Sequence, residues 1–274
     1  MSHAEHLFVF EDGKYRPTLW ARGPWDPSTL HGGAPAALLA HVLEAERRDP
    51  SLWTTRLTID LLRPIRTAAA FTARTQIVRE GRRIQLSDAL LFDNDTLVAR
   101  ASGLMLRRSE SVAEPAPSKN QRLMPSWEGL APYAMGIGAE AQLFHRATEF
   151  RPVPKTHPGQ PMAVWIRIPF SLLPDQPFTK LEYAAAISDY VNAIGSMAHP
   201  TRGGFINADI TLNLHREPEG EWLCLESVAR PDHAGLATST VLLHDTAGPL
   251  GSISACVLAN GTPKGLGSAT GLAR

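Results

Sequence analysis

Asp189 is the residue whose surroundings point most directly to chemistry. It is the single carboxylate in an otherwise uncharged, helix-forming stretch, residues 184–198. An aspartate is costly to bury without a partner, and burial raises the pKa of a carboxyl group. A raised pKa suits a general base. The sequence therefore leaves two interpretations of Asp189 open, a catalytic base or an aspartate that is only hydrogen-bonded or exposed on a helix surface.

A second group that could do chemistry is His31-Gly32-Gly33, at the predicted start of an earlier helix. Glycines let a ligand carbonyl approach the N–H groups that a helix start leaves unpaired, and the helix dipole favours an oxyanion there. The triplet thus predicts a binding site for a substrate carbonyl. The alternative is that the two glycines only permit tight packing of the helix against a neighbour.

The elements that must position these residues occur twice in the same order. A strand pair around the turn at residues 11–14 precedes a helix over 32–48, which Ser28 or Thr29 can cap and Asp49-Pro50 stops. Strand-like runs follow at 56–65, 71–81, 82–94 and 96–107. The second half repeats this order, with strand-like runs at 141–150 and 162–170, a helix over 181–198 and a second series of strands.

This repetition predicts an internal duplication, since residues 57–106 match 208–258 strand for strand and turn for turn. The expected units are 1–108 and 139–260, separated by a Pro- and Ser-rich linker at 109–138 and followed by a flexible, Gly-rich tail at 261–274. An antiparallel sheet buries a single apolar helix only by curling around it. We therefore expect an α+β fold with two antiparallel sheets, each wrapped around a long helix.

Composition excludes several classes of partner and environment. The chain has 274 residues, and its 27 basic side chains balance its 27 acidic ones, so no global field attracts nucleic acid. Neither a signal peptide nor a bilayer-spanning apolar run is recognised. The two cysteines, Cys224 and Cys256, lack metal-ligand or disulfide spacing. We expect a cytoplasmic protein without a structural metal, a membrane contact or a nucleic-acid partner.

The chain resembles the acyl-CoA thioesterases of the double-hotdog, thioesterase II-like type. The resemblance rests on the order and spacing of five segments, at residues 30–45, 56–65, 164–177, 181–195 and 208–216. It implies two hotdog units side by side with joined sheets, and an acyl-CoA substrate held between the helix of one unit and the sheet of the other. It also implies a homodimer or a higher homo-oligomer and no metal or organic cofactor.

The chemistry that the resemblance implies is hydrolysis of an acyl-CoA to free acid and CoA. A carboxylate activates the water, and backbone amides at a helix start polarise the carbonyl. Asp189 falls where the related enzymes keep their catalytic aspartate. The relatives also use a hydroxyl or amide on the first strand after the second helix, where this chain has Asn207, with Thr211 as the nearest hydroxyl.

This chain departs from the family pattern at two places. The relatives carry a Gln on the last strand, where this chain has Ala255, flanked by Ser254 as a candidate substrate-binding hydroxyl. Another group then positions the water, or the substrate differs, or hydrolysis is slow or absent. The 31–33 triplet resembles the HGG of single-hotdog thioesterases, but the carboxylate those enzymes carry two turns further on is missing, because Glu44 lies beyond that position.

Two other functions stay open from the sequence. Asp26 and His31 resemble the acid and base of hotdog enoyl-CoA hydratases, although Ser28 stands where that pattern has Asn. A capping Asp in a rigid loop is an equally good interpretation. A duplicated hotdog can also be a non-catalytic module that binds acyl-CoA.

Overall fold

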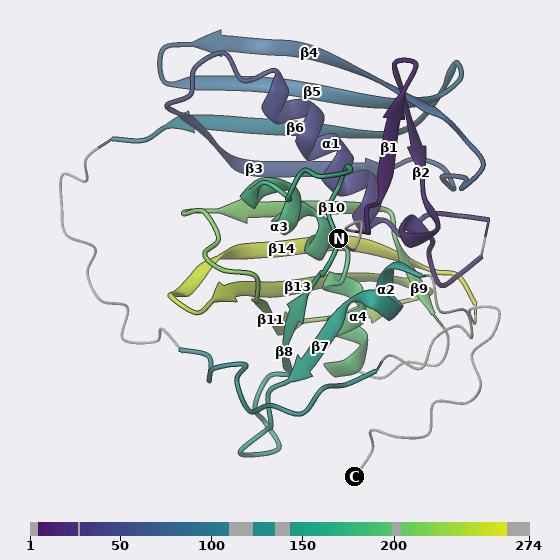
Figure 1. The fold of residues 1–274 in the computed structure, drawn as a ribbon. Helices are drawn as coiled ribbons and strands as arrows, with labels where there is room; N and C mark the ends of the chain where they lie inside the picture. Colours follow the sequence, from purple (N-terminus) through teal and green to yellow (C-terminus); the bar gives the residue numbers. More distant parts are fainter. Residues whose placement is uncertain (1–4, 27, 110–122, 135–142, 199–203, 262–274) are drawn as a thin grey trace.

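The computed structural model describes residues 5–26, 28–109, 123–134, 143–198 and 204–261 (Figure 1). These residues form one antiparallel sheet of fourteen strands with four α-helices and a short 3-10 helix, η1. The first half contains β1 (Phe8–Glu11), β2 (Lys14–Pro17), η1 (Leu19–Ala21), α1 (Gly33–Ala45), β3 (Leu52–Leu61), β4 (Phe71–Gly81), β5 (Ile84–Asp93) and β6 (Thr96–Arg107). The second contains α2 (Phe144–Ala147), β7 (Glu149–Pro152), β8 (Ala163–Arg167), α3 (Lys180–Ser188), α4 (Val191–Ala198), β9 (Phe205–Asn207), β10 (Asp209–Leu214), β11 (Leu223–Ala229), β12 (Asp232–His233), β13 (Leu236–Asp245) and β14 (Gly248–Ala259).

The strand order of the sheet is symmetric about its centre. It runs β1-β2-β4-β5-β6-β3-β10-β14-β13-β11-β8-β7, while β12 pairs with β13 and β9 pairs with β14. Replacing each strand by its counterpart in the other half gives the same order, read from the opposite edge of the sheet. The central pair is β3 and β10, in which Ile59 lies opposite Ile210. The two halves therefore present the same strand order from the centre outwards, as an internal duplication requires.

The helices pack on the apolar face of the sheet. In Figure 1, α1 lies against β5 and β6, and it also contacts β4; α4 contacts β11, β13 and β14 in the other half. Leu38, Leu39 and Leu43 of α1 are fully buried. Gly103 of β6 lies under Leu43, where an added Cβ would come within 3.1 Å of its Cδ1. Helix α3 packs against α1, so the two halves meet through helices as well as through the sheet.

Three local predictions from the sequence are wrong. The first helix is capped by neither Ser28 nor Thr29, since it begins after Gly32, which offers no side-chain hydrogen bond, and it ends at Ala45. The predicted strand over 141–150 contains α2 before its strand portion β7. The predicted helix over 181–198 is two helices, α3 and α4, because its hydrogen-bond ladder breaks at Asp189.

The break at Asp189 has a clear cause in the hydrogen bonds of the backbone. Tyr190 N–H bonds to the carbonyl of Ile187, three residues back, at 3.0 Å. The carbonyl of Asp189 accepts instead from the side-chain amide of Asn207, at 2.9 Å. A side chain from another element therefore satisfies a carbonyl that the helix would otherwise use, and the chain turns at that residue.

The predicted linker and tail lie partly outside the described residues, which omit 110–122, 135–142 and 262–274. The described part of the linker, 123–134, packs on the outer face of the second half. Trp127 stacks on Trp222 with 4.9 Å between ring centroids, and Trp165 Nε1 donates to the carbonyl of Pro125. The division into two units stays a prediction. Within the described ranges, no helix has the length and apolar character needed to cross a bilayer.

Candidate active site

The junction between α3 and α4 places the Asp189 carboxylate against the start of α1. Its Oδ2 lies 2.9 Å from His31 Nδ1 and accepts the backbone N–H of Gly33 at 3.0 Å. Its Oδ1 accepts the side-chain amide of Asn207 at 2.6 Å. His31 and Gly33 from the first half and Asn207 from the second therefore meet at one carboxylate, which connects the two halves of the chain.

The close approach of α1 and α3 depends on the two glycines. A Cβ on Gly32 would lie 2.5 Å from Asp189 Oδ1, and a Cβ on Gly33 would lie 2.4 Å from the carbonyl oxygen of Ala186. Both distances are shorter than any real Cβ contact, so no other residue fits without displacing a neighbour. The packing role that the sequence left open for these glycines is thus present in the structure.

The hydrogen bonds identify which ring nitrogen of His31 carries a proton. Nδ1 lies near both Asp189 Oδ2 and the N–H of Gly33, at 2.9 and 3.1 Å. A carboxylate only accepts, so Nδ1 must be protonated to bond to it, and the Gly33 N–H is then left to the carboxylate. The ring also stacks on Phe144, at 4.3 Å between centroids, and contacts Tyr190. The imidazole is therefore fixed on both its edge and its face.

Asn207 reaches Asp189 because β9 adds to the end of β14, where Asn207 lies opposite Val257. Its amide nitrogen donates to both the carboxylate and the backbone carbonyl of Asp189, which fixes the orientation of the amide group. Its Oδ1 is buried and has no hydrogen-bond partner among the described residues. A hydrogen-bond acceptor beside the carboxylate is thus left for another donor.

The expected rise in the pKa of Asp189 is wrong. Burial acts to raise this pKa, but the charge of His31 and the hydrogen bonds from His31, Asn207 and Gly33 outweigh it and hold the pKa below its ordinary value. The sequence prediction assumed a buried carboxylate without partners. These partners lie at the start of α1 and in β9. Because they lower the pKa of Asp189, its carboxylate is ionised at neutral pH.

The start of α1 offers fewer free donors than the sequence predicts. The N–H of Gly33 is taken by Asp189, and the N–H of Ala34 bonds to the carbonyl of His31. Pro35 has no N–H. Across the described ranges, the N–H of Gly32 is left without an acceptor, so Gly32 is the backbone donor that can meet a substrate oxyanion here.

The structure does not bring Thr211 or Ser254 to Asp189. Ile210 and Ile253, their neighbours along the strands, are in the core, so alternation turns both hydroxyls to the opposite face of the sheet. Thr211 shares a hydrogen bond with another threonine on that face. Ala255 does face the core and is 3% exposed, but it has no polar group. Neither predicted hydroxyl can act on a water held by Asp189.

The hydratase pair is also not assembled as its pattern requires. Asp26 Oδ1 accepts hydrogen bonds from the backbone N–H and the hydroxyl of Ser28, at 2.8 and 2.7 Å. This is the capping role in a rigid loop that the sequence offered as the other interpretation. His31 directs its Nδ1 to Asp189 instead.

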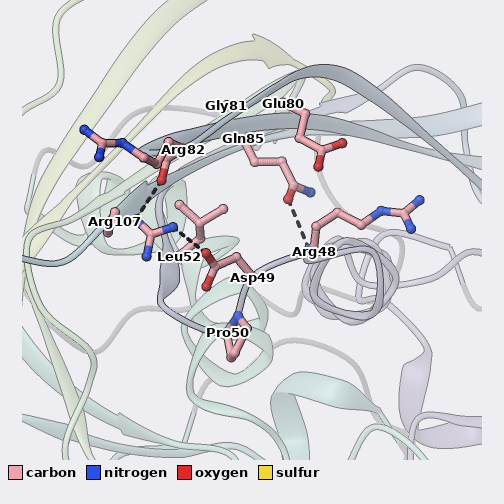
Figure 2. Close-up of a pocket in the computed structure, with 9 residues that line it drawn as sticks. All are labelled: Arg48, Asp49, Pro50, Leu52, Glu80, Gly81, Arg82, Gln85 and Arg107. Carbon is pink, nitrogen blue, oxygen red and sulfur yellow. Dashed lines mark hydrogen bonds and ion pairs between the residues drawn. The ribbon is translucent and has the colours of Figure 1, made fainter.

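A surface hollow of about 620 Å³ lies at the far end of α1, and not beside Asp189. The rise of the helix separates the two places by roughly 20 Å. Figure 2 shows the side chains that line the hollow, in which Arg107 bonds to Asp49 and the backbone N–H of Arg48 bonds to Gln85. The Asp189 side chain is 11% exposed, so the carboxylate is covered and does not face an open slot.

Sequence reasoning missed the contact between His31 and Asp189, which it treated as two separate groups. No local pattern joins residues 158 positions apart, and only the packing of α3 against α1 creates the contact. It also missed Phe144, which lies in α2, where the sequence predicted a strand. An aromatic residue in an apolar run is too common to have identified it.

Two family models match this chain. Residues 21–106 match the acyl-CoA thioesterase N-terminal domain, and residues 111–254 match the acyl-CoA thioesterase C-terminal domain. No curated protein matches the chain.

Solved structures with the same fold cover nearly the whole chain. An acyl-CoA thioesterase II from Mycobacterium marinum is 16% identical, with a TM-score of 0.67 over 94% of this chain and 96% of that one. A protein from Alicyclobacillus acidocaldarius, described as having a hot dog fold, is 15% identical, with a TM-score of 0.69 over 92% and 95%. A structure from Novosphingobium aromaticivorans is 19% identical, with a TM-score of 0.71 over 94% and 100%. The predicted α+β double-hotdog fold is confirmed.

Proposed function

The chain belongs to the acyl-CoA thioesterase family and is a thioester hydrolase, and from this premise we propose that it hydrolyses acyl-CoA to a free acid and CoA at Asp189. The observation that carries the proposal is the contact of the Asp189 carboxylate with His31 and Gly33 at the start of α1. This contact joins the two halves of the chain, between which the resemblance implies that the thioester is held.

The start of α1 supplies the electrostatic part of the proposed reaction. The thioester carbonyl lies at the helix N-terminus, where the unpaired N–H of Gly32 and the helix dipole stabilise the oxyanion that forms on attack. The absence of a side chain on Gly32 lets the Asp189 carboxylate lie against the same helix start. Loss of one such donor typically costs about 10²–10³-fold in kcat.

The carboxylate supplies the charge that activates the water. Asp189 is ionised at neutral pH because its pKa is lowered, and a fixed negative charge favours removal of a proton from a neighbouring water. The side-chain amide nitrogen of Asn207 donates to Oδ1 of Asp189 and so holds the carboxylate. The amide oxygen of Asn207 is a buried acceptor for a hydrogen of that water. Together these groups support a carboxylate-activated water as the nucleophile.

Release of CoA thiol tests this proposal. The purified full chain is assayed with octanoyl-CoA and palmitoyl-CoA, and Asp189→Asn is expected to lower kcat/KM by at least about 100-fold. Asp175→Asn is the matched control, because Asp175 lies exposed in a loop and should leave the rate unchanged. Thiol release that survives Asp189→Asn would refute the assignment of Asp189.

The two alternative functions give different results in the same preparation. An enoyl-CoA hydratase changes the enoyl absorbance of its substrate without releasing thiol. A binding module does neither, yet acyl-CoA raises its melting temperature, because a ligand that binds only the folded state stabilises it. Either pattern, in place of thiol release, would contradict the proposed function.

A further inference from the structure

We propose that His31 is the catalytic base of this hydrolysis, accepting the proton of the attacking water at Nε2, while Asp189 orients and stabilises the imidazole. This inference rests on the proposed function and changes one part of it, the group that receives the proton. It assigns to His31 a role beyond binding the substrate carbonyl.

The Asp189 carboxylate has little capacity left to accept a proton directly. Oδ2 accepts from both His31 and Gly33, and Oδ1 accepts from Asn207. The Cα–H of Gly32 covers Oδ1 from another side, since a Cβ built in its place would lie 2.5 Å from that oxygen. Hydrogen bonds to the ionised form weaken a carboxylate as a base. A water would need to displace one of these donors before Asp189 could take its proton.

The position of the His31 imidazole suits a base that accepts a proton from water. Nδ1 donates to the carboxylate, which leaves Nε2 on the other edge of the ring, with no hydrogen-bond partner in the part of the chain that the structure describes. Stacking on Phe144 at 4.3 Å and contact with Tyr190 at 5.1 Å prevent the ring from turning. The His31 side chain is 8% exposed, so the ring is largely buried. A neutral imidazole with Nδ1 protonated accepts a proton at Nε2.

The same pair explains how this chain can work without the family Gln. Ala255 cannot hold a water, and Thr211 and Ser254 lie on the other face of the sheet. A histidine that bonds to the catalytic carboxylate provides another way to hold and activate the nucleophile. The group that replaces the Gln is then His31, at the start of α1, rather than a residue of β14.

The proposed steps balance in atoms and charge. A water held by Nε2 loses one proton to that nitrogen as its oxygen bonds to the thioester carbon, and the carbonyl oxygen becomes an oxyanion at the N–H of Gly32. The ion pair of imidazolium and Asp189 carboxylate stabilises this state. The carbon–sulfur bond then breaks, and the proton on Nε2 passes to the leaving sulfur. The products are the acid and CoA with a free thiol.

Two variants separate a base from a merely structural histidine. The side-chain amide nitrogen of His31→Asn takes the place of Nδ1 and keeps a donor to Asp189, but it has nothing in the place of Nε2. His31→Phe keeps a ring against Phe144 and loses both nitrogens. We expect kcat/KM for octanoyl-CoA to fall about 10²–10⁴-fold in both variants, the usual contribution of a positioned base. If His31→Asn stays within tenfold of the wild type, His31 only holds Asp189 and the proposal is overturned.

The failure of this inference and the failure of the proposed function look different. Without thiol release from the wild type, the proposed function itself fails. If the wild type releases thiol and Asp189→Asn does not, while His31→Asn is nearly as active as the wild type, the function stands and the base is not His31. Melting temperatures of all variants show that the losses are not caused by unfolding.

Discussion

Replacing Gly32 by Ala is the sharpest test of how the site is built. The backbone of Gly32 has φ −60° and ψ −23°, a conformation that alanine prefers. Removing glycine there should stabilise the folded chain by about 0.4–1 kcal/mol if nothing else changed. The new methyl group would, however, lie 2.5 Å from Asp189 Oδ1 and 2.8 Å from Cγ. The substitution therefore acts on the carboxylate and not on the local backbone.

The size of the effect follows from these contacts. Ordinary van der Waals contact begins at 3.4 Å, so the carboxylate has to withdraw by about 0.9 Å. A shift of that size lengthens hydrogen bonds that are now 2.9 and 3.0 Å beyond useful range. Each bond to a charged group contributes about 1.5–3 kcal/mol, and a misplacement of about 1 Å costs about 100-fold in rate. We expect kcat/KM to fall about 100-fold and the free energy of unfolding to fall by about 1–3 kcal/mol.

The assay is thiol release from octanoyl-CoA, together with unfolding in urea. Gly81→Ala is the matched control, because a Cβ there would meet its nearest atoms at 3.6 Å, an ordinary contact, and Gly81 lies in an exposed hairpin. Gly33→Ala should be more damaging to the fold, since its Cβ would meet the backbone carbonyl of Ala186 at 2.4 Å. Wild-type activity in Gly32→Ala would refute the idea that the exact placement of Asp189 matters.

The remaining predictions concern the hydrogen bonds and the charge of the same carboxylate. Asn207→Leu keeps the approximate volume of the side chain but removes the donor to Asp189, so the free energy of unfolding should fall by about 1–3 kcal/mol, measured in urea, and the rate of thiol release should also fall. The lowered pKa of Asp189 predicts a stability that is present above the unfolded pKa, about 3.9, and is lost as the pH falls through the lower folded value. The advantage of the wild type over Asp189→Asn in unfolding free energy should therefore shrink as the pH falls below about pH 4. A difference that does not shrink below about pH 4 would contradict the direction of the pKa shift.

Periodicity and turn chemistry were sufficient to predict the elements of the sheet. The predicted strand at 71–81 has the bounds of β4, and the turn at residues 11–14 joins β1 to β2, with Asp12 and Gly13 at positive φ. Alternating burial is a local property, so sequence reports it directly. Alternation along β10 places Thr211 on the face of the sheet opposite to Ile210, which is in the core, so Thr211 cannot act beside Asp189.

The candidate site was harder to predict because its chemistry depends on contacts between distant residues. The type and burial of Asp189 were readable from an apolar helix, but its pKa shift was not, since the sign depends on His31, Gly33 and Asn207. The break in the second helix has the same origin, because Asn207 takes the carbonyl of Asp189. Propensity favours an unbroken helix here, and a tertiary hydrogen bond overrides it.

The symmetric strand order places a second contact of this kind at the other ends of α1 and α3. There the start of α3 meets the last turn of α1, and Thr179, in the place that Gly32 takes on α1, donates its hydroxyl to Glu44. Thr179 and Glu182 also form a capping box that satisfies the N–H of each. The N–H and the hydroxyl of Thr179 are both bound to carboxylates, so a thioester carbonyl would not find there the free N–H that Gly32 offers. The repeated order of elements places two helix starts opposite a carboxylate, and the difference between glycine and threonine is what directs the proposed chemistry to one of them.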